Sequence, residues 1–119
     1  MRDHRKLEVF HLADALVALV YRATRGFPSE EVFGLVAQMR RCAVSVPANI
    51  VEGCARRSER DYGRFLDISF GSVRELGYFI DLSARLNYIA AGNAEELRTA
   101  QGRTAAALAA LIRARRSRL

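Results

Sequence analysis

The sequence predicts an all-α protein, an antiparallel up-down four-helix bundle with a proline-kinked second helix. Apolar residues recur at every third or fourth position over four long segments, as on the buried face of an amphipathic helix. Alanine, leucine and arginine, which are good helix formers, are the commonest residues. Short turns separate the segments and favour antiparallel neighbours. The 119 residues are expected to form a single domain, residues 1–119, with a core that needs neither disulfides nor a metal.

The first two helices are expected over about residues 7–24 and 30–54. Pro28 ends the first, and Ser29 is the predicted N-cap of the second. Pro47 removes one backbone hydrogen bond inside the second helix, so we expect a kink there rather than a break. The expected core stripes are Val9, Ala13, Leu16 and Val20 in the first helix, and Leu35, Met39, Cys42, Ala43, Val46 and Ile50 in the second.

The last two helices are expected over about residues 58–88 and 93–115, followed by a basic C-terminal tail. Ser58 is expected to begin the third helix, and Asn93 with Glu96 has the spacing of a capping box. The third helix is expected to turn inward Tyr62, Phe65, Ser69, Ser72, Val73, Leu76, Ile80, Ser83 and Leu86. The fourth is expected to turn inward Leu97, Thr104, Leu108 and Leu111.

Two cysteines, Cys42 and Cys54, lie in one predicted helix. Twelve residues of helix separate them by roughly 18 Å, too far for a disulfide within one subunit, so both are predicted to be small buried hydrophobes. The charged start of the chain lacks the apolar region of a secretory signal, and no apolar run approaches the ~18 residues of a membrane span. These features predict a cytoplasmic protein without membrane contact.

Apolar residues surround the second and third helices on more than one side. At about 100° per residue, some of these residues lie opposite or beside the core stripe. A helix that is apolar nearly all round is buried on several sides, which predicts a homo-oligomer. The alternative is the scatter of exposed hydrophobic residues that monomers commonly show. The predicted oligomer interface is Val44, Val51, Phe70, Tyr78 and Leu82.

A polar stripe runs along one side of the second helix at spacings of three and four. Arg41 and Asn49 are expected to find partners in Glu75 and Ser72 of the third helix. One interpretation is a binding groove or catalytic surface. The other, which we favour, is a hydrogen-bonded network that fixes helix register or subunit packing. The predicted structural network is Gln38, Arg41, Ser45, Asn49, Glu52 and Glu75.

The formal net charge is +6, and eighteen of the nineteen basic residues are arginine. This charge indicates either an anionic partner such as nucleic acid or a merely soluble, arginine-rich surface. No aromatic stacking platform is evident, so sequence-specific reading of a single strand is not expected. The predicted phosphate contacts are Arg56, Arg57, Arg60 and Arg64, together with Arg113, Arg115, Arg116 and Arg118 near the C-terminus.

Motifs of catalysis and metal binding are not evident. Glu8 and His11 have the Glu-x-x-His spacing of di-iron bundles, but these need a second such motif, and the other histidine is His4. Neither a nucleophile elbow, nor a phosphate-binding loop, nor a dinucleotide fingerprint occurs. We therefore predict no catalytic residue, no cofactor or metal ligand, no small-molecule substrate and no enzymatic activity.

Five stretches of the chain resemble one family of helical proteins. Residues 7–10, 27–28 and 31–35 resemble its opening, and residues 38–53, QMRRCAVSVPANIVEG, closely resemble its signature. Residues 65–76, FLDISFGSVREL, resemble its second signature. The family comprises four-helix-bundle proteins related to those encoded in intervening sequences of bacterial 23S ribosomal RNA genes. Cys42 and Val51 stand where alanine is usual in that pattern, and both remain small and apolar.

The resemblance implies a four-helix bundle that assembles as a five-fold ring and a family without an assigned biochemical function. Distant relatives of similar fold are basic accessory proteins of diversity-generating retroelements, which engage nucleic acid and a reverse transcriptase; this is an analogy of fold. The leading hypothesis is an oligomeric, non-catalytic module that binds RNA or a nucleoprotein through arginine clusters. The alternative is a protein–protein interaction scaffold without nucleic-acid binding.

Overall fold

The computed structural model describes residues 2–117. They form four α-helices: α1 (Glu8–Thr24), α2 (Leu35–Cys54), α3 (Glu59–Arg85) and α4 (Ala91–Arg116). Two short 3-10 helices, η1 (His4–Lys6) and η2 (Ser29–Glu31), precede α1 and α2. The described residues contain no strand, so the prediction of an all-α bundle is confirmed.

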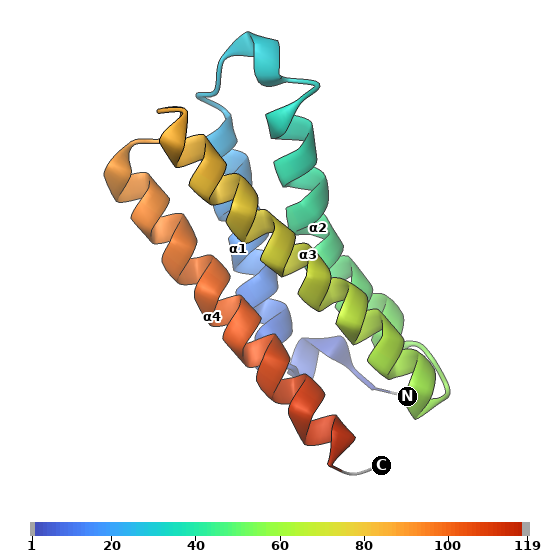
Figure 1. The fold of residues 1–119 in the computed structure, drawn as a ribbon. Helices are drawn as coiled ribbons and strands as arrows, with labels where there is room; N and C mark the ends of the chain where they lie inside the picture. The colour runs from blue at the N-terminus through green and yellow to red at the C-terminus, as the bar shows by residue number, and fades with distance from the viewer. Residues whose placement is uncertain (1, 118–119) are drawn as a thin grey trace.

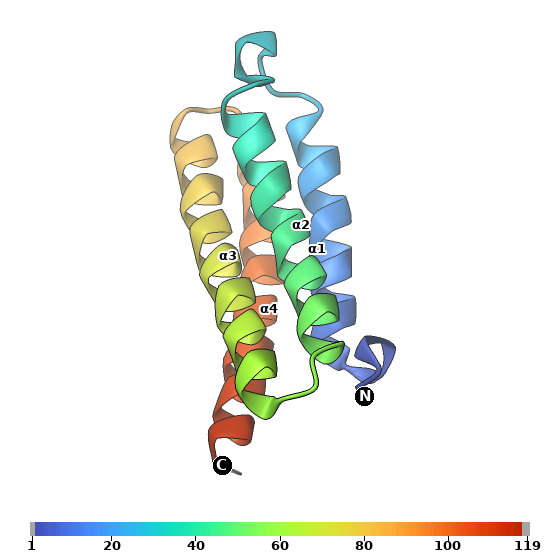
Figure 2. The same cartoon turned by 90° about the vertical axis from the view of Figure 1, so that its right-hand side faces the viewer.

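Successive helices run in alternating directions in a bundle 45 Å long and 23 by 20 Å across (Figure 1). The α1–α2 and α3–α4 connections lie at one end. The α2–α3 loop lies at the other end with both termini of the chain, as the view turned by 90° also shows (Figure 2). Each helix packs against two others, α1 and α3 both contacting α2 and α4.

One hydrophobic core fills the space between the four helices. Every residue of the stripes expected in the first two helices is buried. In α3 the stripe is turned slightly from the expected one, because Leu66 faces the core while Phe65 and Ser72 are only partly buried. Leu86 follows the end of α3 and is 45% exposed. In α4, Ile112 is buried where Leu111 was expected, beside the confirmed core positions Leu97, Thr104 and Leu108.

Pro47 lies inside α2, which continues as one helix on both sides of it. One residue earlier, the carbonyl of Val46 accepts a hydrogen bond of 2.8 Å from the buried Ser69 hydroxyl of α3. This bond ties α3 to the turn that contains the proline and satisfies a hydroxyl that burial would otherwise leave without a partner. The expected kink stays a prediction.

The start of α2 differs from the prediction. Ser29 begins η2 rather than α2, and α2 begins at Leu35 after Gly34, which has no side chain to cap it. The Glu31 carboxylate takes that role, because Oε1 accepts from the Leu35 amide at 3.2 Å and Oε2 accepts from the Tyr88 hydroxyl at 3.0 Å. Ser29 as the N-cap of α2 is therefore wrong. A carboxylate four residues before the first helical amide satisfies that amide instead.

The turn between α3 and α4 also departs from expectation. Ser58, expected to begin the third helix, is the N-cap of α3 and accepts a hydrogen bond of 3.0 Å from the Asp61 amide. However, α3 already ends at Arg85, and Asn87 adopts the left-handed backbone conformation, with φ of 61°. Asparagine tolerates this conformation better than most residues. The chain therefore turns early, α4 begins at Ala91, and Asn93 lies within its first turn instead of capping it.

Two glycines within helices are expected to respond oppositely to alanine. A Cβ at Gly53 would lie 3.0 Å from Phe65 Cβ and 3.2 Å from Tyr62 Cδ1, where α2 approaches α3 closely. Gly53→Ala should therefore lower the free energy of unfolding by about 1–2 kcal/mol through overpacking. At the matched position Gly71 a Cβ meets nothing within 4 Å, and Gly71→Ala should raise it by roughly 0.5–1 kcal/mol. Urea unfolding of both variants checks this, and a stabilising Gly53→Ala would contradict it.

Candidate functional site

Figure 1 shows the end of the bundle that holds the N-terminal segment, the α2–α3 loop and the end of α4. The sequence concentrates basic residues there. This basic end comprises residues 2–8, 52–67 and 113–116, which contain ten Lys and Arg and six Asp and Glu. The remaining described residues contain eight basic and seven acidic side chains. Four of the five excess positive charges of the described chain therefore lie at the basic end.

Glu59, the first residue of α3, organises the centre of this end. Its Oε2 accepts from Arg115 Nε at 3.3 Å and Nη2 at 2.9 Å, and its Oε1 forms an ion pair with Arg2. Both guanidinium groups also stack on the Tyr62 ring, at 4.0 Å for Arg2 and 4.7 Å for Arg115. Such cation–π contacts hold the two arginines in fixed positions.

Arg115 is a correction to the predicted phosphate contacts. Its side chain is 6% exposed, because it lies along Gly63 and Tyr62 and pairs with Glu59. A buried, paired guanidinium links α4 to α3 and does not present its charge to a ligand. Arg118, also expected near the C-terminus, lies outside the described residues.

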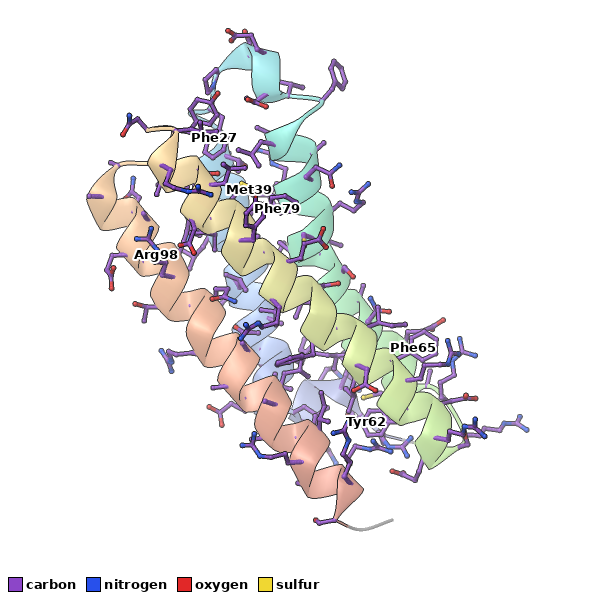
Figure 3. All side chains as sticks on the ribbon, viewed as in Figure 1. Phe27, Met39, Tyr62, Phe65, Phe79 and Arg98 are labelled. Atoms are coloured by element: carbon purple, nitrogen blue, oxygen red, sulfur yellow. The ribbon has the colours of Figure 1, made fainter. Side chains whose placement is uncertain are left out.

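Phe65 lies beneath a second pair of arginines, with Arg56 at 4.9 Å and Arg64 at 4.6 Å from its ring centroid. Arg56 also donates to Glu52 at 2.5 Å, while Arg64 and Arg116 lie 4.0 and 3.9 Å from Asp61 and Asp67. Exposed ion pairs of this kind are worth little, ~0–1 kcal/mol, and exchange readily with other anions. Figure 3 shows Tyr62 and Phe65 at this end of the bundle.

Four cations of the basic end are exposed and have no carboxylate within 4.0 Å among the described residues. Three belong to the predicted set, and Lys6 in the N-terminal segment was not predicted. Helical periodicity gives no information on where such a segment folds back, so the sequence offered no signal for Lys6. The four cations are Lys6, Arg57, Arg60 and Arg113.

Two open hollows lie on two sides of Glu59, which lines both of them. The larger, of about 770 Å³, lies between α3 and α4 and is lined by Arg60, Arg64 and Arg116 with Asp61 and Asp67. The smaller, of about 490 Å³, lies at the α2–α3 loop and is lined by Arg2, Arg56 and Arg57. Arginines therefore outnumber carboxylates by four to three in the larger hollow and by three to one in the smaller.

The polar stripe of α2 forms a network, but with other partners than expected. Arg41 donates to Gln38 and makes no ion pair with Glu75 among the described residues. Ser45 and Ser72 share a hydrogen bond of 2.7 Å, and Asn49 bonds Ser45 at 2.9 Å rather than Ser72. Gln38 and Arg41 bond each other and Glu52 pairs with Arg56, so these three residues are not bonded to Ser45 and Asn49. A small cavity of about 170 Å³ remains between the stripe and α3.

Cys42 lies in the wall of this cavity. Its thiol donates to the Ser72 carbonyl at 3.0 Å and approaches Glu75 Oε1 at 3.5 Å. Burial and the neighbouring Glu75 carboxylate raise the pKa of the Cys42 thiol to about 12. Burial also raises the pKa of Cys54, which lies inside the core. Because the thiolate is the reactive form, neither cysteine has the environment of a nucleophile at neutral pH.

The predicted interface residues differ in exposure. Val44, Val51 and Tyr78 are 41%, 37% and 56% exposed. Phe70 and Leu82 are instead partly buried and pack against the core. Phe33 falls within the helix expected over residues 30–54, but it lies in the loop before α2, where it is 96% exposed, and it is not among the predicted interface residues.

Glu8 and His11, the Glu-x-x-His pair, lie at the start of α1. His11 Nε2 lies 2.7 Å from the Arg5 carbonyl, and Glu8 is exposed. Within residues 2–117, no group of three or more His, Cys, Asp or Glu side chains is placed to hold a metal ion. None of the helices described has the length and apolar character needed to cross a membrane.

Comparison with known proteins identifies the family. A crystal structure of a protein of unknown function from the S23 ribosomal protein family of Bacteroides thetaiotaomicron superimposes with a TM-score of 0.80 at 22% identity. The match covers 88% of this chain and 95% of that chain, which shows the shared fold. No curated protein matches the chain. The family model of the 23S rRNA-intervening sequence protein matches residues 5–110, and the chain therefore belongs to this family.

Proposed function

We propose that this protein is a non-catalytic, oligomeric module that binds RNA or a nucleoprotein through its basic end. The observation that carries the proposal is the concentration of positive charge at one end of an otherwise nearly neutral bundle. A merely solubilising arginine content would be spread over the surface. Exposed guanidinium groups grouped together attract a polyanion and release its counterions.

The proposed contacts are those cations whose charge is accessible. Arg57, Arg60 and Arg113 are exposed and without a carboxylate partner among the described residues, and Lys6 joins them. Arg64 and Arg116 are the next candidates, because their ion pairs are long and exposed. Arg56 and Arg115 mainly hold the end together through Phe65, Tyr62 and Glu59.

We also propose assembly into a homo-oligomer, with a five-fold ring as the form that the family resemblance favours. Val44 and Val51 lie about 40° or less from Arg40 around α2, and Arg40 bonds Thr24 of α1 at 2.9 Å. Tyr78 lies about 60° from Asp81 around α3, and Asp81 pairs with Arg98 of α4. The two apolar patches thus lie on opposite sides of the α2–α3 seam. Two different patches on one subunit suit head-to-tail contacts, which close into rings.

Nucleic-acid binding is tested by filter binding of a structured RNA of mixed helices and loops, from ~50 mM salt upward. We expect binding that weakens steeply as salt rises, because each phosphate contact releases counterions. The double variant Arg57→Ala/Arg60→Ala should bind at least about ten-fold more weakly, at roughly 0.7 kcal/mol or more per lost contact. The control variant Arg22→Ala/Arg25→Ala removes two exposed arginines from the C-terminal end of α1, at the end of the bundle away from the basic end. It should bind RNA as tightly as the parent protein does.

The second candidate function is a protein–protein interaction scaffold whose charge only solubilises it. The observation in its favour is Phe33, which is 96% exposed at the end of the bundle opposite the basic end. No RNA binding at ~50 mM salt would reject the first function in favour of this one, since phosphate contacts strengthen as salt falls.

A further inference from the structure

We propose that the basic end binds a nucleic-acid duplex in preference to a single strand, by contacting phosphates of both strands across a groove. The inference rests on the proposed function and names the form of nucleic acid that this surface fits. Three features of the basic end support it: the two arginine-containing hollows, the arginines that cover its aromatic rings, and the hydrogen bonds and ion pairs that fix its shape.

The two hollows of the basic end each contain an exposed arginine that could contact a phosphate. One contains the exposed Arg60 and the other the exposed Arg57, and Glu59, at the start of α3, lies between them. Exposed arginines in two separate hollows therefore offer two phosphate sites, which the two strands of a duplex can fill together. A single strand offers one row of phosphates.

The aromatic rings of this end are covered, so the bases of a single strand cannot stack on them. Tyr62 is 4% exposed, and Arg2 and Arg115 stack on its ring. Phe65 is partly buried beneath Arg56 and Arg64. Single-strand binders gain about 1–3 kcal/mol per base from stacking on exposed rings. Without that gain the surface depends on charge density, which is highest in a duplex at one phosphate per ~1.7 Å of axis.

Contacts between distant segments fix the shape of both hollows before any ligand arrives. Arg2 Nη1 donates to the Arg56 carbonyl at 3.1 Å, which joins the N-terminal segment to the α2–α3 loop. Glu59 joins this segment and α3 to Arg115 of α4. A surface that is already ordered loses less conformational entropy on binding, so few accessible cations suffice for measurable affinity.

The test compares duplexes with their own component strands. Fluorescence anisotropy would be measured with 20-base-pair DNA and RNA duplexes and each separated strand, at several salt concentrations. We expect each duplex to bind at least ~10-fold more tightly than its strands. With four phosphate contacts, log K against log salt should fall with a slope of about −3.6 for B-form DNA, at ~0.9 per contact. Comparing the affinities of the DNA and RNA duplexes shows which duplex geometry binds the hollows better.

Single-site variants connect the preference to the two hollows. Arg57→Ala and Arg60→Ala should each reduce the duplex slope by about 1 and lower duplex affinity more than single-strand affinity. Arg25→Ala, an exposed arginine at the opposite end, should change neither. Single strands that bind as tightly as the duplex would overturn this inference and leave nucleic-acid binding standing. No binding of either form at ~50 mM salt would reject the proposed function itself.

Discussion

Replacing Glu59 with alanine is expected to lower the free energy of unfolding by about 3 kcal/mol, although the Glu59 side chain itself is 53% exposed. The reason is its partner, because Arg115 is 6% exposed and would keep its charge without a carboxylate. Removing one member of a buried ion pair typically costs ~3–5 kcal/mol of stability. Because Glu59 itself is half-exposed, we expect a loss at the lower limit of this range. The same change also removes the ion pair of Arg2. Urea unfolding followed by far-ultraviolet circular dichroism measures the loss.

Asp81→Ala is the matched control. Asp81 also lies on α3, also pairs with an arginine of α4 at 2.9 Å, and is 60% exposed. Its partner Arg98 is 43% exposed, however, so solvent screens the pair and would hydrate the Arg98 guanidinium once Asp81 is removed. We expect a loss of ~1 kcal/mol or less. Equal losses in the two variants would show that burial of Arg115 does not determine the stability of the basic end.

The core could be predicted from the sequence because it depends on local periodicity. A repeat of 3.6 residues places Val9, Leu16 and Val20 on one face of α1 whatever lies opposite, and all three are buried. Helix ends are harder to predict, because the group that satisfies a free amide need not be the residue just before the helix. Glu31 satisfies the Leu35 amide from four residues away, and no capping pattern describes that.

The candidate site was predictable in its location and not in its details. Clustered arginines near the α2–α3 loop and the end of α4 were visible in the sequence. Which of them are accessible depends on contacts across more than fifty residues, as between Glu59 and Arg115, 56 positions apart. Lys6 joins the site because the N-terminal segment folds back toward the α2–α3 loop, where Arg2 bonds the Arg56 carbonyl. Side-chain periodicity describes neither contact.

Replacing Val44 with glutamate, or Tyr78 with glutamate, is expected to convert the proposed oligomer to monomers. Each substitution buries a charge without a partner in an apolar contact, which costs several kcal/mol and shifts association by a hundred-fold or more. Analytical ultracentrifugation at several concentrations measures the mass. Ala106→Glu, at an exposed position on α4, is the control and should assemble as the parent does. A parent protein that is monomeric throughout would contradict the proposed assembly.

Mixing the two variants tests the head-to-tail geometry itself. In that geometry the apolar patch on α2, with Val44 and Val51, contacts the patch on α3, with Tyr78, of the next subunit. Each variant therefore keeps one of these patches intact and loses the other. An equimolar mixture of Val44→Glu and Tyr78→Glu should therefore form a one-to-one dimer and stop there, because the outer patches of the dimer both carry the glutamate. If each patch instead paired with its own copy, the mixture would contain only the species that each variant forms alone. A sedimenting species of twice the monomer mass, present in the mixture and absent from both separate variants, is thus the signature of a heterologous contact.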